Sequence, residues 1–431
     1  MTVRSTEPLD MRTLPGSEDI IRQTLPNGII VIVWENPHSP SVVVDAFVHA
    51  GSIYEKRPKA GLASYTASML MRGTKNASFE EIHEKIESVG TSLGFSSAVH
   101  TVGFGGKSLP EDLDLILETA ADAVRNPTFP NDHLERMRAE ILTGLAMRSH
   151  NTRAMASLTF YETLFGPNHP YGFSNNGYHE SIGNITRADL RDFHKQHYGP
   201  TGMIVTIVGN VTANKAMSLV ESHFGDWDNK KQPDIATAPT VQSIDCIKKQ
   251  HVSIPGKTQT DIVLGYVGPK RSDPDFQSVR IANSILGVFG MYGRLGKTIR
   301  KKHGLAYYSF SKADASFGPG TWRLIAGVDP SNVNTTIKIM LEEINRLILE
   351  PVSHEELDDN KSNALGSVPI QLETNSGIAA TLSSMELHGL GMNYLQYLPK
   401  QIKDISRQDI RSAADRLLDP DTYVVASAGP Q

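Results

Sequence analysis

The segment GLASYTASMLMRGT, from Gly61 to Thr74, carries apolar residues at helical spacing and predicts a helix over residues 62–72. Residues four apart lie one turn apart on the same face of a helix, so Ser64 and Ser68 should be neighbours, with Ala67 beside them. A serine hydroxyl is a poor zinc ligand, and an alanine side chain cannot accept a proton. Taken alone, the segment could also be an ordinary amphipathic core helix.

The 431-residue chain is long enough for two or three domains, and 39% hydrophobic with 21% charged residues is the composition of a soluble globular protein. Forty-two basic and 47 acidic residues give a formal charge of −5, so charge offers no reason to expect nucleic acid or an anionic membrane as a partner. A single cysteine, Cys246, excludes an internal disulfide. The N-terminus lacks a signal-peptide core, so we expect a cytoplasmic protein, or a periplasmic one if a signal has been removed.

The chain repeats one pattern at about half its length. Residues 108–142 read as a helix that begins at a proline, a proline break and a second helix, and residues 328–365 read the same way. Pro110 matches Pro330, at an offset of 220 residues. Both halves close on a turn followed by a buried strand, in residues 198–211 and 418–430. A duplication explains this arrangement economically.

Three further patterns set the expected organisation. Asn-Gly precedes a strand over residues 29–34, with residues 41–51 as its expected partner strand. A continuous helix is expected from about Ser278 to Lys301. Residues 226–243 contain breaks and little apolar periodicity, which indicates a linker between domains 1–225 and 244–431. Strands grouped against helices favour an α+β class, each domain having a mainly antiparallel sheet packed with helices.

The whole chain resembles the insulinase/pitrilysin-like (inverzincin) zinc metallopeptidases. The resemblance covers LPNGIIVIVWENPHSPSVVVDAFVHAGSIYE, GLASYTASMLMRGT, PTFPNDHLERMRAEI, HKQHYGPTGMIVTIVGNV and GMYGRLGKTIRKKHGLAYYSFS in order. It implies two homologous domains of the mitochondrial-processing-peptidase-like fold. The family's active-site helix carries His-x-x-Glu-His, in which two imidazoles hold Zn²⁺ and the glutamate accepts a proton from the bound water.

By this resemblance the zinc motif is lost. Ser64, Ala67 and Ser68 stand where the family has its two histidines and its glutamate. The third family ligand, a glutamate, falls near Thr143 and Gly144, and neither position carries a carboxylate. We therefore expect no metal in this chain, and Zn²⁺ in a partner subunit.

A second set of residues survives in the second half. Arg300 in the last helical turn and Tyr307 at the start of the next strand are spaced like the Arg/Tyr pair that binds the substrate carbonyl in the family. Gly304 is expected to end the helix in the left-handed conformation. The alternative is that Arg300 only complements the helix dipole and Tyr307 is an ordinary strand residue. Tyr308 should point to the opposite face of the sheet.

Two histidine patterns are weaker candidates. His194 and His197 are three residues apart and could share a metal, but no third ligand is evident, and histidine also suits a helix end. The run HEKIE at His83 to Glu87 lacks the second histidine of a zinc helix and reads as a solvated face.

The resemblance implies a bacterial, non-catalytic subunit of a heterodimeric zinc endopeptidase, inactive alone. A homologous zinc-bearing partner would hydrolyse an extended peptide whose carbonyl Arg300 and Tyr307 bind. The alternative is a proteolytically inactive structural or peptide-binding homologue, similar to the core subunits of a respiratory complex. Whether isolated chains form homodimers stays open.

Overall fold

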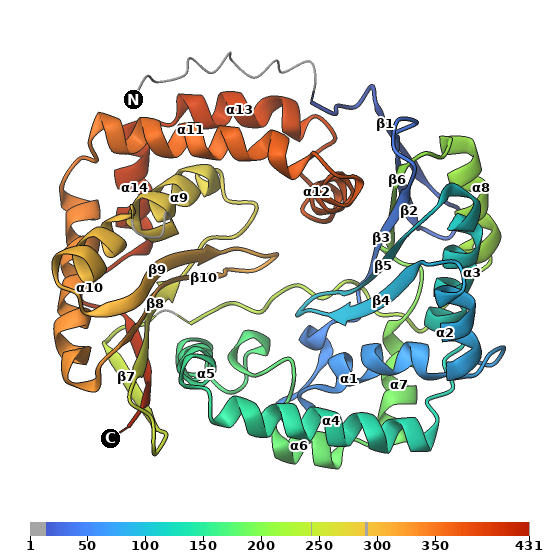
Figure 1. Ribbon diagram of the computed structural model, residues 1–431, viewed down its shortest axis with the longest axis horizontal. Helices are drawn as coiled ribbons and strands as arrows, with labels where there is room; N and C mark the ends of the chain where they lie inside the picture. The colour runs from blue at the N-terminus through green and yellow to red at the C-terminus, as the bar shows by residue number, and fades with distance from the viewer. Residues whose placement is uncertain (1–13, 243, 289–291, 431) are drawn as a thin grey trace.

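Two sheets, one from each half of the chain, form the framework of the computed structural model, which describes residues 14–242, 244–288 and 292–430 (Figure 1). In the described residues the first sheet has six strands. Their order across the sheet is β1 (Ile20–Thr24), β2 (Ile30–Glu35), β6 (Ile204–Gly209), β3 (Val42–Val48), β5 (Val102–Ser108) and β4 (Ser92–Ser97).

Within the described residues, the second sheet repeats this order without an equivalent of β1. It runs β7 (Lys248–Ser253), β11 (Val424–Gly429), β8 (Thr260–Val267), β10 (Thr321–Val328) and β9 (Ala306–Asp314). In each sheet the last strand of its half pairs parallel with the strand that corresponds to β2, and the remaining pairs within the described chain are antiparallel. The predicted α+β class with two homologous, mainly antiparallel domains is confirmed.

Helices surround both sheets and follow the same repeat. Pro110 and Pro330 each begin a short 3₁₀ turn that leads into a long helix, as the sequence repeat indicated. The first half contains α1 (Leu62–Met69), α2 (Phe79–Glu87), α3 (Leu113–Arg125), α4 (Asn131–Ser149), α5 (Thr152–Phe165), α6 (His179–Asn184), α7 (Arg187–His197) and α8 (Ala213–Phe224). The second contains α9 (Phe276–Asn283), α10 (Val333–Leu349), α11 (His354–Gln371), α12 (Asn375–Leu387), α13 (Tyr394–Asp404) and α14 (Arg407–Leu417).

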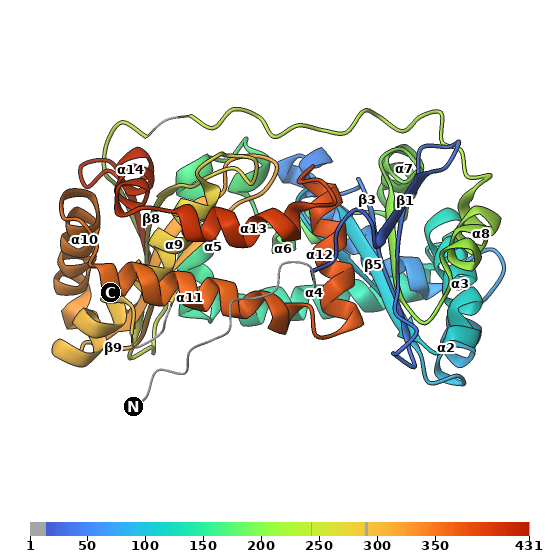
Figure 2. The ribbon, with the colours of Figure 1, turned by 90° about the horizontal axis from the view of Figure 1, so that it is seen from above.

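One helix from each half packs on the sheet of the other half. Figures 1 and 2 show α5 beside the second sheet and α12 beside the first. On α5, Ala156 and Phe160 are fully buried in a cluster with strand residues of the second sheet, among them Val263, Val424 and Ala426. This exchange joins the two halves through two apolar surfaces.

Buried polar contacts secure both exchanged helices. The hydroxyl of Thr152 at the start of α5 donates to Asp261 Oδ2 on β8 at 2.5 Å. The hydroxyl of Ser383 on α12 donates to Thr206 Oγ1 on β6 at 2.9 Å. Because Asp261 and Thr206 are almost completely buried, these bonds satisfy groups that water cannot reach.

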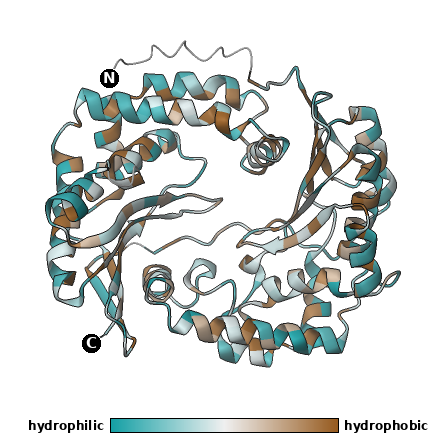
Figure 3. Cartoon of the chain, in the orientation of Figure 1, coloured by the Kyte–Doolittle hydropathy of each residue, from teal (hydrophilic) through white to brown (hydrophobic). Residues whose placement is uncertain are grey.

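The segment between the halves has no helix or strand over residues 226–242 and 244–247. Figure 2 shows it crossing one side of the molecule. The amide of Ala236 donates to the phenol oxygen of Tyr54 at 3.1 Å, and His169 Nε2 lies 3.2 Å from the carbonyl oxygen of Pro239. In Figure 3 hydrophobic residues concentrate on the strands around β3 and β6, whereas the outer helices mix both kinds.

Two expectations about local structure were wrong. Strands β2 and β3 are not partners, because β6 lies between them and pairs with both. The continuous helix expected from Ser278 to Lys301 is interrupted: α9 passes into a π-helical turn (Ser284–Val288), residues 289–291 lie outside the described residues, and a second π-helical segment, η8, covers Gly296–Lys302. A Cβ added at Gly293 would lie 2.9 Å from Gly287 Cα, so these glycines permit a backbone contact that excludes a straight helix.

We expect Phe160→Ala to lower the free energy of unfolding by about 3–5 kcal/mol, since it empties the contact between α5 and the second sheet. Amide exchange should accelerate in β11 and β8 but not in β2 and β6. Tyr397→Ala on α13, where the side chain is 59% exposed, is the control and should change stability by less than about 0.5 kcal/mol. Faster exchange confined to the first sheet would contradict the observed packing of α5.

Candidate functional site

Three of the positions that the resemblance assigns to the zinc ligands border one cavity. Ser64 and Ser68 on α1 and Gly144 on α4 border a cavity of about 300 Å³. α1 begins at Gly61, whose φ of +94° is a conformation that suits glycine, and ends in a 3₁₀ turn over residues 70–72. The structure thus brings together the expected ligand positions, of which Ser64 and Gly144 are 80 residues apart in sequence.

The side chains at this cavity do not fit a zinc ion. The Ser68 hydroxyl donates to the Ser64 carbonyl oxygen at 2.9 Å within the helix, and Ala67 is 2% exposed in the core. Thr143 Oγ1 donates to the carbonyl oxygen of Ala139, and Gly144 has no side chain. Nowhere in the described residues do three His, Cys, Asp or Glu side chains gather as metal ligands would. A tetrahedral zinc site needs at least three such ligands.

A buried carboxyl group holds the start of α1. Glu55 accepts hydrogen bonds from the backbone N–H groups of Gly61, at 2.9 Å, and Ala63. Burial raises the pKa of the Glu55 carboxyl to about 8, although both N–H donors oppose that rise. Glu55 therefore fixes α1 in place and is largely protonated at neutral pH.

We expect the raised pKa of Glu55 to make stability fall as pH rises. The folded protein keeps the proton up to about pH 8, whereas the unfolded chain releases it near pH 4.5, so the stabilisation is complete below pH 4.5 and is lost by pH 8. The fall in the free energy of unfolding between pH 5 and 8 should amount to a few kcal/mol, and Glu55→Gln should remove it. Glu111→Gln, at an exposed carboxylate, is the control; equal slopes in both variants would contradict this role.

The second candidate pair lies at the surface of the second half. Arg300 and Tyr307 are both exposed, Tyr307 to 81%, and the guanidinium carbon of Arg300 lies 5.4 Å from the centre of the Tyr307 ring. Gly304 has φ +64° and ends η8 in the left-handed conformation, as expected. The chain reversal at Gly304 therefore brings the two side chains together.

A β-bulge directs Tyr307 away from the sheet. Ala306 pairs with Val328 and Tyr308 pairs with Gly327, which leaves Tyr307 as an extra residue on β9. Bulges of this kind re-aim a side chain and are frequent beside active sites. A Cβ at Gly327 would lie 2.8 Å from the Tyr308 ring, so glycine is needed where the register shifts. The sequence analysis missed this bulge; Gly327 was the signal that could have indicated it.

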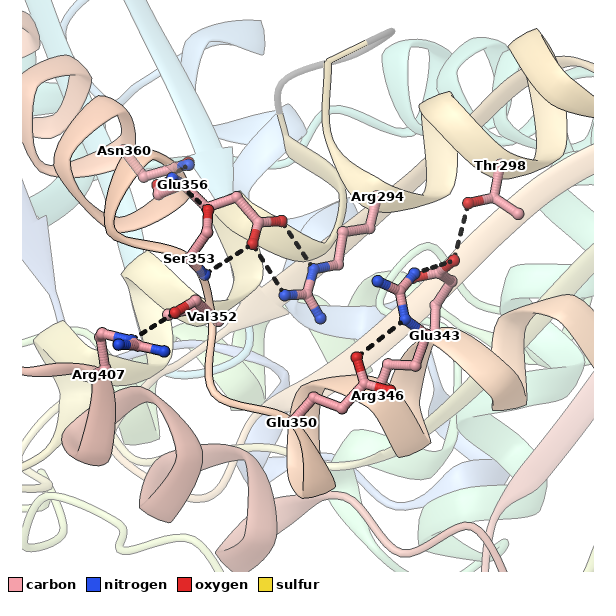
Figure 4. Close-up of polar contacts among 10 residues, drawn as sticks. All are labelled: Arg294, Thr298, Glu343, Arg346, Glu350, Val352, Ser353, Glu356, Asn360 and Arg407. Atoms are coloured by element: carbon pink, nitrogen blue, oxygen red, sulfur yellow. Dashed lines mark hydrogen bonds and ion pairs between the residues drawn. The ribbon is translucent and has the colours of Figure 1, made fainter.

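An ion pair between the buried Arg294 and the partly exposed Glu356 anchors the segment that leads to Arg300 (Figure 4). Arg294 Nε and Nη2 donate to the two carboxylate oxygens of Glu356 on α11 at 2.9 and 3.0 Å. Burial alone would raise the pKa of Glu356, but hydrogen bonds from Arg294 and Ser353 outweigh it and hold the pKa at about 2. The hydroxyl of Thr298 on η8 donates to Glu343 on α10 at 2.7 Å. Thus η8 is fixed to two helices of its own half.

We expect Arg294→Met to lower the free energy of unfolding by about 2–4 kcal/mol, because it leaves the Glu356 carboxylate without its partner. Amide exchange should also accelerate in residues 296–302. The control is Lys338→Met, which removes an exposed ammonium 3.9 Å from the exposed Glu342 and should change stability by less than about 1 kcal/mol. Similar losses in both variants would show that the Arg294 pair has no special part in holding η8.

The remaining histidine and tyrosine candidates make contacts that are typical of residues with a structural role. His194 Nε2 lies 2.7 Å from the Val124 carbonyl oxygen, and the His197 ring stacks on Tyr54, with burial lowering the pKa of both histidines to about 4. His83 Nδ1 lies 3.4 Å from Glu87 on an exposed helix face. Tyr308 packs against the apolar cluster that contains α5, and the guanidinium carbon of Arg153 lies 4.9 Å from the centre of its ring.

This duplicated fold and the site around α1 define a class, the insulinase-type peptidases. The family model of insulinase, peptidase family M16, matches residues 30–168, and that of the peptidase M16 inactive domain matches residues 184–364. The chain belongs to this family.

Relatives and solved structures agree with this assignment. A protein of Mycobacterium leprae described as an uncharacterized zinc protease is 27% identical over 417 residues, covering 96% of this chain and 92% of the relative. The uncharacterized zinc protease YmxG of Bacillus subtilis is 21% identical, with 95% and 98% covered.

A crystal structure of a peptidase M16 inactive domain from Pseudomonas fluorescens superimposes with a TM-score of 0.88 at 25% identity, covering 96% of this chain and 98% of that chain. A protease from Helicobacter pylori, at 24% identity, shares the fold with a TM-score of 0.88 over 97% of this chain and 100% of its own. A chain of complex III from Candida albicans, at 17% identity, shares the fold with a TM-score of 0.77 over 95% of each chain. In the described part of this protein, no helix is both long and apolar enough to cross a bilayer.

Proposed function

We propose that this protein is the non-catalytic subunit of a two-chain zinc endopeptidase. The observation that carries the proposal is the contrast between its two candidate sites. The face of α1 offers serine and alanine where zinc chemistry needs imidazole and carboxylate, whereas Arg300 and Tyr307 stand exposed on a fixed segment. A homologous partner would supply Zn²⁺ and the general base.

The Arg/Tyr pair suits the binding of a carbonyl that is under attack. A guanidinium and a phenol both donate hydrogen bonds to oxygen, and a peptide carbonyl gains negative charge as water adds to it. Donors held in place before the reaction stabilise that charge without reorganising. The bulge at Tyr307 and the anchoring of η8 through Arg294 and Thr298 provide that fixed placement.

The exposure of the pair favours a role in an assembly. Arg300 lies over the ring of Tyr307, and Tyr307 keeps most of its surface open to solvent. An oxyanion donor is effective only where water is excluded. A partner that covers this surface would supply the low-dielectric surroundings that the isolated chain lacks.

We expect a mixture of this chain with a homologue that carries His-x-x-Glu-His to cleave a quenched fluorescent peptide that neither chain cleaves alone. Arg300→Ala and Tyr307→Phe should each lower kcat about 100-fold, the typical effect of removing one oxyanion donor. Lys301→Ala is the matched control, because Lys301 is adjacent and faces the Tyr292 ring instead. Zinc content and complex formation should be unchanged in all three variants.

The same assay separates the alternatives. Cleavage that is indifferent to both substitutions would exclude Arg300 and Tyr307 as carbonyl donors. A complex that forms without cleaving any peptide would favour the structural or peptide-binding alternative.

A further inference from the structure

The cavity between α1 and α4 is lined by a positively charged side chain, whereas a cation site is lined by negative or neutral groups. Within the described residues that line it, Arg148 is the one charged side chain, and no carboxylate or imidazole is among them. Arg148 lies one helical turn after Gly144 on α4. The place where related enzymes would hold a dication therefore presents a guanidinium.

The Arg148 side chain is fixed but keeps donors to spare. Its Nη1 donates to Ser174 Oγ at 2.7 Å and its Nη2 donates to the Gly177 carbonyl oxygen at 3.0 Å. A guanidinium has five N–H donors and stays charged at any working pH. Burial lowers the pKa of Arg148, although the nearby Tyr178 and Glu162 oppose that shift.

The two acidic groups near this cavity are engaged elsewhere. Glu162 accepts a hydrogen bond from the Tyr178 phenol at 2.5 Å and lies 3.3 Å from Arg57 Nη2. Glu55 accepts the N–H groups at the start of α1 and is largely protonated below pH 8. Neither one forms a hydrogen bond or an ion pair with Arg148, although Glu162 is close enough to oppose the lowering of the Arg148 pKa.

We propose that this cavity binds the terminal carboxylate of a peptide, with Arg148 as its counter-charge. The planar guanidinium matches the two oxygens of a carboxylate. Ser64 Oγ and the side-chain amide of Asn176 also border the cavity and can donate further hydrogen bonds. One positive charge balances a carboxylate, whereas a phosphate dianion would leave an uncompensated charge in a partly desolvated site.

A second cavity beside the first favours a peptide over a small free acid. It has a volume of about 450 Å³, its walls include Tyr161, Phe165 and Tyr171, and Asn176 borders both cavities. A peptide whose carboxylate contacts Arg148 can therefore place an aromatic side chain against an apolar wall. Aromatic pairs of this kind add to the energy of simple burial.

The inference goes beyond the proposed function, because binding here requires neither a zinc-bearing partner nor Arg300. We expect isothermal titration of the isolated full-length chain at pH 6.5 to detect binding of acetyl-Phe-Ala with a free carboxylate. The corresponding amide should bind at least tenfold more weakly, and Arg300→Ala should bind the acid unchanged. Equal binding of acid and amide would overturn the proposal whatever the outcome of the peptidase assay.

Two substitutions at Gly144 isolate the effect of charge. A Cβ at Gly144 meets no atom within 4 Å, so a side chain can start there without a close contact. Gly144→Asp places a carboxylate four residues before Arg148, where it can pair with the guanidinium, and should weaken binding of the acid at least tenfold. Gly144→Asn has nearly the same shape without the charge and should weaken it less than threefold. Equal effects would contradict a role for charge.

Arg148→Met tests the guanidinium directly, and Arg136→Met removes the same charge from an exposed position of α4. We expect the first to weaken binding of the acid at least tenfold and the second to leave it unchanged. If Arg148→Met fails to fold, the Gly144 pair still decides, since it retains Arg148. Inorganic phosphate at a concentration equal to that of the acid should not displace it; displacement would overturn the assignment to a carboxylate.

Discussion

Each sheet of this protein is covered on one face by a helix from the other half of the chain. α5 of the first half buries Phe160 against β8 and β11, and α12 of the second half packs on β3 and β6. Neither sheet would have a complete core if the halves separated, because apolar strand residues would face water. The exchange therefore fixes the relative placement of everything attached to the two sheets.

The exchange of helices also determines where the cavity between α1 and α4 lies. Arg148 lies at the end of α4, and α5 begins only a few residues later at Thr152, where its hydroxyl is bonded to Asp261 of the second sheet. The aromatic wall of the neighbouring cavity comes from α5 and from the loop after it, and Asp314 to Ser316 of the second half closes its other side. The two halves thus build this region together, whereas Arg300 and Tyr307 depend on the second half alone.

The sequence predicted the duplication, the α+β class and the helix end at Gly304, because these depend on local spacing and local backbone chemistry. It could not indicate that β6 separates β2 from β3, since strand order is a long-range property. The broken helix after α9 was missed because the contact of Gly287 with Gly293 lies in tertiary packing. The lost zinc motif was readable as residue identities, but Arg148 was not, because only the fold shows that it borders the same cavity.

The two candidate sites differ in the chemical groups that they present. Around α1, Ser64, Ser68 and Arg148 border the cavity, and at η8 and β9 the exposed Arg300 and Tyr307, which we propose to bind a peptide carbonyl, lie on an anchored segment. The most direct measurement is a structure of this chain bound to a homologous zinc-bearing subunit and an uncleaved peptide. Our account predicts that the Arg300 guanidinium and the Tyr307 phenol lie within hydrogen-bonding distance of one peptide carbonyl oxygen, opposite the partner's zinc. If both side chains instead faced solvent, remote from the peptide, the account would be contradicted.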